Sequence, residues 1–223
     1  MTQSNSPVDL GVESVNELAR NFWYSAILRA GIKLDVFSLL ENDSLTSQEV
    51  AVRISASPRY TQAFLDSCAV LELLEKKADK YNNSSMSSKF LVKGKAAYVG
   101  DHALHHTNTW DSWGHLDEVI KEGKTRLPYE TGFVDANTYW TDYMIGQHNR
   151  ATSGQAHYLV ESLDLANKRK LIDLGGGAAS YSIALCAANP QLKAVVVDQK
   201  EPLVVAKPLV EEAKLQDQIS LVE

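Results

Sequence analysis

The spacing of apolar residues predicts helices through the first part of the chain. Between Val15 and Leu40 apolar residues recur at helical intervals in two adjoining rows, so we expect a helix that is buried on several sides. Gly31 is expected to interrupt it and divide it into two helices. So much apolar surface is typical of ordinary core, and also of a helix that the subunits of a dimer exchange.

Two shorter helices and a turn-rich segment are predicted next. Thr46 and Glu49 have the spacing of a capping box, in which each side chain satisfies a backbone donor at a helix start. Ser57 is predicted to cap the following helix, with Pro58 at its first position, where the missing N–H costs nothing. Followed by "KADKYNNSSMSSKFL", these helices have the outline of a winged helix.

A winged helix raises the question of DNA binding, and the charges argue against it. Residues 44–100 carry eight Lys or Arg against five Asp or Glu, a balance of only +3. The helix that would read bases offers Arg59, Thr61 and Gln62 and then turns acidic and apolar. The whole chain has a net charge of −6, whereas proteins that bind nucleic acid need a basic surface.

Composition places the chain among globular proteins. Of its 223 residues, 44% are hydrophobic and 22% charged. Cys68 and Cys186 lie in apolar helical patterns, which predicts buried free thiols in a reducing compartment. Residues 1–10 lack the basic and apolar regions of a signal peptide, and no stretch reaches the roughly 18 apolar residues of a membrane span. A cytoplasmic location is therefore expected.

A histidine-rich segment invites a metal-site interpretation. Residues 99–124 look helical, with His102, His105 and His106 within one turn. Spacings of three and four can bring imidazoles to one helix face, but no cysteine pair or matching acidic residue completes a site. A helix with a His-rich polar side is the favoured interpretation, and no metal is predicted.

The chain is predicted to divide near residue 125. Gly123, Pro128 and Gly132 punctuate a looser stretch, which is typical of a connection between domains. We therefore expect one domain over residues 1–125 and a second over residues 126–223.

A long helical pattern follows this connection. Trp140, Met144 and His148 recur every four residues and so share one helix face. Core packing is one interpretation; the wall of a small-molecule pocket is the other, for which an adaptable methionine and an aromatic ring are suited.

The strongest chemical signal is a glycine triplet. The strand-like run "KLIDL" contains Asp173 and leads directly into Gly175, Gly176 and Gly177. A helical segment follows, and a second strand "KAVVVD" ends on Asp198, 25 residues after Asp173. A strand, a glycine turn, a helix and a strand ending in an acid form the first half of a doubly wound nucleotide site, in which the acid accepts hydrogen bonds from ribose hydroxyls.

The detail of this loop points to one ligand class. A dinucleotide fingerprint requires glycine at position 180, where this chain has Ser180. The pattern D-x-G-x-G instead resembles the loop of S-adenosylmethionine-dependent methyltransferases. Across residues 15–223 the chain resembles small-molecule O-methyltransferases of the plant-type and bacterial natural-product family, in "FWYSAILRAGIKLDVF", "SSKFL", "WDSWGHLDEVIKEGK" and "LIDLGGGAASYSIALCAANPQLKAVVVD".

The resemblance implies a fold, an activity and partners. The fold would be a mostly α winged-helix dimerisation domain followed by the first half, β-α-β-α-β, of a Rossmann-like α/β domain. The activity would be O-methylation of a small phenolic or polyketide-like molecule by a homodimer, without nucleic acid or membrane.

The resemblance also implies site residues. Asp198 would hold the ribose of S-adenosylmethionine and Gly175 its methionine part. The remaining cofactor residues would be Gly176, Gly177 and Asp173. Met144 would lie on a helix that borders cofactor and acceptor. Trp140 and His148, which share its helix face by spacing, are the further candidate acceptor contacts.

Two departures from the family matter. Ala179 stands where the family has glycine, and is tolerable only with a negative φ. The family's histidine base would lie beyond Glu223, so we expect an incomplete chain that has no catalytic residue, is inactive alone and has "KLIDL" at an open apolar sheet edge. The alternative is a non-catalytic dimerising or regulatory protein derived from such an enzyme.

Overall fold

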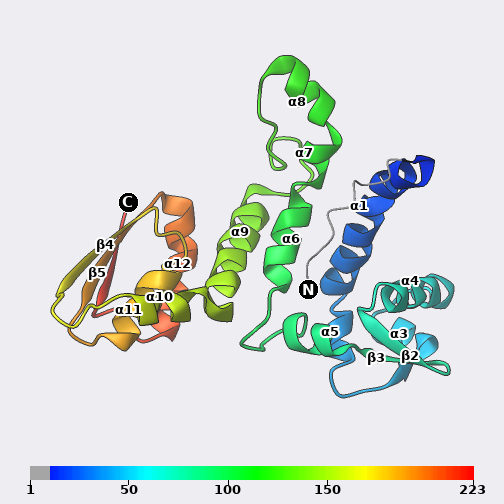
Figure 1. Ribbon diagram of the computed structural model, residues 1–223, viewed down its shortest axis with the longest axis horizontal. Helices are drawn as coiled ribbons and strands as arrows, with labels where there is room; N and C mark the ends of the chain where they lie inside the picture. Colours follow the sequence, from blue (N-terminus) through cyan, green and yellow to red (C-terminus); the bar gives the residue numbers. More distant parts are fainter. Residues whose placement is uncertain (1–10) are drawn as a thin grey trace. The chain divides into compact units, whose positions relative to one another are not determined.

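The computed structural model describes residues 11–223 and divides into two compact units (Figure 1). The first ends at Ser84 and the second comprises Ser85–Glu223. Residues 1–10, on which the expectation of no targeting signal rests, lie outside the described residues. Within the described part, no helix is long and apolar enough to cross a membrane.

The first unit is helical with a small antiparallel sheet, whose strand order is β1-β3-β2. Its elements are α1 (Val12–Lys33), α2 (Val36–Leu39), β1 (Leu45–Thr46), α3 (Ser47–Arg53), α4 (Pro58–Val70), β2 (Leu74–Lys77) and β3 (Lys80–Asn83).

Helix α1 corrects two expectations. The predicted interruption at Gly31 is wrong, because α1 continues to Lys33 and the chain turns at Asp35, whose φ is +53°. Gly31 is buried instead, and a Cβ there would lie 2.7 Å from the ring of Phe37, so the glycine makes room for that ring. The expected burial on several sides is not made within this chain, since Gly31 and Ile32 are buried but Leu18 is 69% exposed.

The helix starts of the first unit follow the local sequence. The capping box is confirmed: Glu49 N donates to Thr46 Oγ1 over 3.3 Å, and Thr46 N donates to Glu49 Oε2 over 2.8 Å. Pro58 occupies the first position of α4, as predicted, while the side chain of Ser57 makes no capping hydrogen bond. The predicted free thiols are confirmed for Cys68 and Cys186, and burial raises the pKa of Cys68 to about 12.

The second unit consists of helices followed by a parallel sheet. Its elements are α5 (Ser85–Phe90), α6 (Gly100–Asn108), α7 (Trp110–Gly114), α8 (Leu116–Glu122), α9 (Ala136–Arg150), the π-helical segment η1 (Ala151–Gln155), α10 (Ala156–Ser162), β4 (Lys170–Leu174), α11 (Ser180–Ala188), β5 (Lys193–Val197), α12 (Lys200–Glu212) and β6 (Ile219–Val222).

Helices α6 and α9 lie side by side (Figure 1). A Cβ on Gly146 would lie 2.8 Å from the Cα of His102, so the glycine lets the two backbones approach. Asn108 Nδ2 also donates to Asp142 Oδ2 over 2.7 Å. These contacts join residues on the two sides of the boundary predicted at residue 125. The division into 1–125 and 126–223 stays a prediction.

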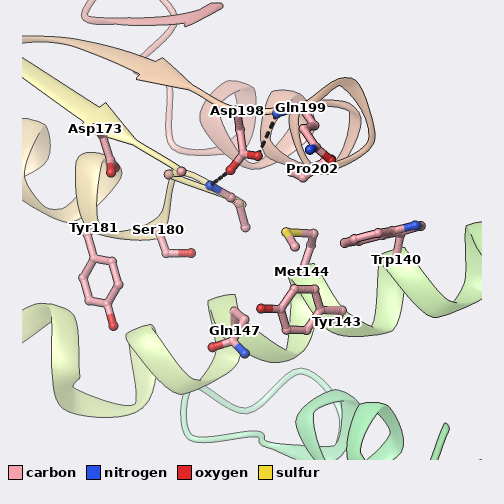
Figure 2. Close-up of a pocket in the computed structure, with 14 residues that line it drawn as sticks. Trp140, Tyr143, Met144, Gln147, Asp173, Ser180, Tyr181, Asp198, Gln199 and Pro202 are labelled. Atoms are coloured by element: carbon pink, nitrogen blue, oxygen red, sulfur yellow. Dashed lines mark hydrogen bonds between the residues drawn. The ribbon is translucent and has the colours of Figure 1, made fainter. Parts of the chain in front are cut away.

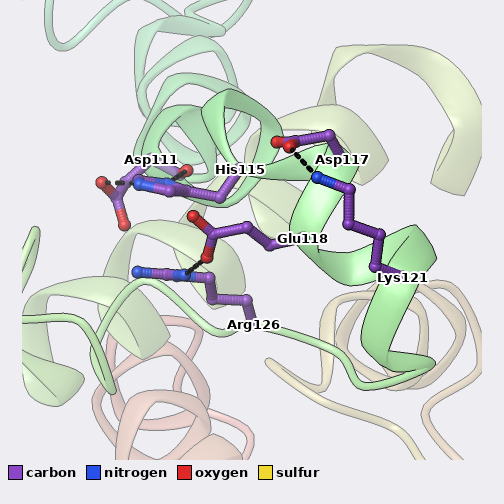
Figure 3. A network of polar contacts seen from close by, with 6 residues as sticks. All are labelled: Asp111, His115, Asp117, Glu118, Lys121 and Arg126. Atoms are coloured by element: carbon purple, nitrogen blue, oxygen red, sulfur yellow. Dashed lines mark hydrogen bonds and ion pairs between the residues drawn. The ribbon is translucent and has the colours of Figure 1, made fainter.

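The histidine-rich segment forms three helices rather than one, and polar contacts hold its last part together (Figure 3). Lys121 Nζ pairs with Asp117 Oδ2 over 3.0 Å, one turn away on α8. Arg126 pairs with Glu118, which attaches the chain after α8 to that helix.

The parallel sheet has the predicted β-α-β-α-β order, with strands arranged β4-β5-β6. Ala194 and Val196 face a core that α11 and α12 complete. In the neighbouring strand β4, Ile172 and Leu174 are 67% and 77% exposed. Strand β4 is an edge strand of the described sheet, as expected.

Candidate cofactor site at the carboxyl edge of the parallel sheet

A cavity of about 470 Å³ opens where β4 and β5 end (Figure 2). One wall is α9, and the other is the glycine loop with the starts of α11 and α12. The size lies within the range of small-molecule sites, and the carboxyl ends of parallel strands are where open α/β sheets bind ligands.

Each glycine of the loop has its own physical reason. Gly175 and Gly177 have φ of +68° and +54°, the left-handed region that favours glycine. A Cβ on Gly176 would lie 2.6 Å from Val196 Cγ1 and 2.8 Å from Asp173 Cγ, so a side chain does not fit. The three predicted glycines all line the cavity.

Asp198 joins the end of β5 to this loop. Its Oδ2 accepts a hydrogen bond from Gly177 N over 2.8 Å, and its Oδ1 accepts one from Gln199 N over 2.7 Å. A carboxylate offers about four acceptor positions. Asp198 therefore positions the loop and keeps acceptor capacity for hydroxyl groups of a ligand.

Asp173 also lines the cavity but has a partner of its own. Its Oδ2 accepts a hydrogen bond from Ser182 Oγ over 2.7 Å, which ties the first turn of α11 to β4. The side chain thus supports the loop in addition to facing the cavity.

Ala179 does not meet the condition of a negative φ under which alanine was judged tolerable. Its φ is +58°, and it is fully buried immediately before α11. The turn from loop into helix requires this conformation: Ala179 N donates to Gly176 O over 2.9 Å. An L-residue pays on the order of 1 kcal/mol there, so alanine occupies a position that favours glycine.

The face predicted on α9 only partly lines the cavity. Trp140 and Met144 do so, and the Met144 sulfur lies 3.4 Å from the point where a Cβ on Gly177 would be. His148 is not among the lining residues; its Nδ1 lies 2.9 Å from Ser180 Oγ. Burial lowers the pKa of His148.

Sequence reasoning missed several lining residues. Tyr143 and Gln147 lie three and seven positions after Trp140, and helical spacing contains the signal that would have found them. The others adjoin motif residues or follow β5. They are Ala178, Ser180, Tyr181, Gln199 and Pro202.

The three histidines of α6 are divided between two environments. His102 Nε2 and His106 Nε2 are 3.1 Å apart, whereas the His105 ring packs 4.5 Å from that of Tyr143. Burial lowers the pKa of His105 to about 4. Across residues 11–223, no three His, Cys, Asp or Glu side chains are grouped as a metal site would require.

Comparison with known proteins gives a consistent family. Residues 16–93 match the O-methyltransferase dimerisation domain. The tetracenomycin polyketide synthesis 8-O-methyl transferase TcmO of Streptomyces glaucescens is 30% identical over 195 residues, covering 86% of this chain and 58% of that protein. The N,N-dimethyltransferase OxyT of Streptomyces rimosus is 26% identical over 213 residues, covering 92% of this chain and 62% of that protein.

A solved structure adds the fold. Human N-acetylserotonin methyltransferase, determined in complex with S-adenosylmethionine, superposes with a TM-score of 0.80 at 26% identity, covering all of this chain and 67% of that one. The predicted resemblance is confirmed: the chain is a relative of the class I S-adenosylmethionine-dependent O-methyltransferases. It spans less than two thirds of the length of TcmO and OxyT.

Proposed function

We propose that this chain binds S-adenosylmethionine in the cavity and serves methyl transfer to a hydroxyl of a small molecule. The observation that carries the proposal is the bond from Gly177 N to Asp198, which closes a glycine loop over the end of a parallel sheet. Gly175 lines the cavity without a side chain, and nothing lies within 4 Å of where its Cβ would be, so a ligand can approach the backbone there. Asp198 would accept from the ribose hydroxyls, with Gly175 against the methionine part.

The residues present fit the chemistry of that cofactor. Its sulfonium supplies the methyl group, so the protein's tasks are to align donor and acceptor and to remove the hydroxyl proton. The Met144 sulfur adjoins the loop and Trp140 forms the neighbouring wall. These two side chains would align the methyl donor and a flat acceptor. We assign the proton-removing base to no residue of this chain.

The acceptor class follows from the wall on α9 and from the relatives. The rings of Trp140 and Tyr143 both line the cavity and pack edge to face with centroids 6.0 Å apart, which presents an aromatic surface suited to a phenolic or polyketide-like molecule. The predicted acceptor contact of His148 is replaced by the role argued in the next subsection. A nitrogen acceptor, as the name of OxyT indicates for that protein, is an outcome of the test.

The first unit would serve assembly. Residues 16–93 match a dimerisation domain, and Leu18 and Phe22 on α1 are 69% and 53% exposed. We propose a homodimer that buries this face. Helices α3 and α4 with the β2–β3 hairpin would form a winged helix that supports the dimer and reads no nucleic acid, with residues 1–125 serving assembly and 126–223 the cofactor.

Isothermal titration of the 223-residue chain with S-adenosylmethionine tests the proposal. Asp198→Ala is expected to weaken binding at least tenfold, because a carboxylate that accepts ligand hydrogen bonds contributes about 1.5–3 kcal/mol. Asp198→Asn keeps one carbonyl acceptor, so its affinity for S-adenosylmethionine is expected to lie between that of the parent and that of Asp198→Ala. Glu211→Gln, on the exposed side of α12, is the control. Binding by Asp198→Ala within twofold of the parent contradicts the site.

Transfer of a labelled methyl group to phenols, hydroxylated polyketides and aromatic amines tests the reaction. Product on a hydroxyl supports the proposal, and product only on nitrogen reassigns the acceptor atom. Because no residue of this chain is assigned as the base, cofactor binding without product is expected of the 223 residues alone. The non-catalytic alternative is favoured only if a protein that extends this chain to the length of its relatives also gives no product.

A further inference from the structure

A hydrogen bond joins α9 to the start of α11 beside the cavity. His148 Nδ1, near the end of α9, lies 2.9 Å from Ser180 Oγ, the first residue of α11. Ser180 lines the cavity and is only 7% exposed. His148 is therefore one residue removed from the cavity, and any effect it has on a ligand passes through the serine hydroxyl.

The imidazole leaves part of the hydroxyl's bonding capacity for a ligand. Burial lowers the pKa of His148, against a smaller opposing effect of Glu212, so the ring is neutral near pH 7. Neutral Nδ1 either donates to Ser180 Oγ or accepts from it. A hydroxyl has one donor and two acceptor positions, so it retains either its proton or its lone pairs for a third group.

The position of Ser180 selects the part of the ligand that it meets. Asp198 and Gln199 follow β5, whereas Ser180 and Tyr181 follow β4 and begin α11. Figure 2 shows these two pairs on different sides of the glycine loop, with Gln147 of α9 on the Ser180 side. With the ribose at Asp198, the polar end farthest from the nucleoside falls at Ser180.

We propose that His148 is a positioning residue that holds Ser180 Oγ in place as a polar contact for the amino-acid end of the cofactor, its α-ammonium and α-carboxylate. This inference rests on the proposed function. The helical spacing with Met144 suggested that His148 contacts the acceptor. The inference assigns it instead to holding a residue that contacts the cofactor.

Two ligands separate this role from general support of the fold. S-adenosylhomocysteine carries the amino-acid end, and 5′-methylthioadenosine has the same nucleoside and a thioether but lacks that end. Ser180→Ala and His148→Gln are expected to weaken S-adenosylhomocysteine about tenfold, roughly 1.4 kcal/mol, and to leave methylthioadenosine within twofold. Titration calorimetry of the 223-residue chain measures both.

Conservative variants test the geometry of the bond. An asparagine amide lies near the place of Nδ1 and a glutamine amide near that of Nε2, so His148→Asn is expected to retain S-adenosylhomocysteine binding within threefold of the parent. The double variant His148→Gln/Ser180→Ala is expected to lose no more than Ser180→Ala, since a residue acting through another is coupled to it. His157→Gln is the control, because that imidazole is 77% exposed on α10.

The outcomes separate the two proposals. If the parent binds neither ligand, the proposed function fails and this inference with it. If the parent binds both and His148→Gln weakens both equally, or Ser180→Ala weakens neither, the cofactor site stands and the positioning role is overturned. Additive losses in the double variant overturn it as well.

Discussion

Helices α1 and α11 both carry apolar side chains at helical spacing, but in the structure these side chains have opposite environments. In α1 the apolar side chains lie at the surface: Leu18 is 69% and Phe22 53% exposed. In α11 Leu185 is 4% exposed and Cys186 fully buried against the parallel sheet. Apolar periodicity thus identifies a face that needs cover without showing what covers it. The described residues of the chain cover α11, whereas α1 keeps a face suited to a second copy.

The largest expected effect concerns the face of α1. Leu18→Glu is expected to raise the dissociation constant of the proposed dimer about 30-fold or more, because a charge at an apolar interface costs about 2 kcal/mol. Sedimentation velocity over a concentration series measures the change.

Asn16→Glu is the matched control for Leu18→Glu. It adds the same charge to α1 two positions away, on another side of the helix, and is expected to leave the dimer intact. A parent chain that is monomeric at micromolar concentration contradicts the proposed dimer face on α1. A Leu18→Glu variant that still dimerises as the parent does contradicts it as well.

The next effect concerns the loop that precedes α11. Gly176→Ala is expected to lower the free energy of unfolding by about 1–3 kcal/mol, the usual cost of overpacking, since its Cβ would lie 2.6 Å from Val196 Cγ1. Urea denaturation at fixed protein concentration measures this. Gly114→Ala, where nothing lies within 4 Å of the added Cβ, is the control. Equal effects of the two substitutions argue against the close approach at Gly176.

A pH-dependent effect is expected from His105. Burial lowers its pKa to about 4 from the 6.5 of an unfolded chain. Between these values the unfolded chain binds more protons, so the folded state loses stability as the pH falls from 6.5 toward 4. His105→Gln is expected to reduce the loss of unfolding free energy between pH 7 and pH 5. Water partly screens this half-buried ring, so the reduction is smaller than for a fully buried imidazole.

Urea denaturation at the two pH values compares His105→Gln with the parent, and His157→Gln is the control because its ring is exposed. An unchanged pH dependence in His105→Gln contradicts the buried, neutral state of His105 against Tyr143.

The smallest effect compares two alanines with the same backbone conformation. Ala78 and Ala179 have φ of +56° and +58°, but Ala78 is exposed in the turn between β2 and β3 and Ala179 is fully buried. Ala78→Gly is expected to stabilise the chain by about 0.5–1 kcal/mol through relief of strain. In Ala179→Gly the loss of a buried methyl group, about 0.8 kcal/mol, offsets this gain.

Thermal and urea denaturation of the two glycine variants measure the difference. A larger stabilisation by Ala179→Gly than by Ala78→Gly would show that strain at the cofactor loop exceeds the contribution of the buried methyl group.

Features whose partners are close in the chain were predictable from sequence. The Thr46–Glu49 capping box and Pro58 at the start of α4 depend on backbone geometry within a few residues. The strand, glycine loop and helix from β4 to α11 belong with them, because turn chemistry and periodicity are local properties. These same local features contained the resemblance to the methyltransferase family.

Three features depend on packing or backbone conformation that the spacing of residue types does not record. Gly31 was expected to break a helix, but the ring of Phe37 packs against it. Alanine was judged tolerable at position 179 only with a negative φ, but its φ is +58°. The spacing put His148 on one helix face with Trp140 and Met144, but it contained no sign of Ser180, a partner 32 residues away. Composition and local pattern indicated the elements and the ligand class that is proposed for this protein. Only tertiary packing decided which side chains meet at the cavity, because a contact across 32 residues depends on how whole helices and strands pack, and no local periodicity records that.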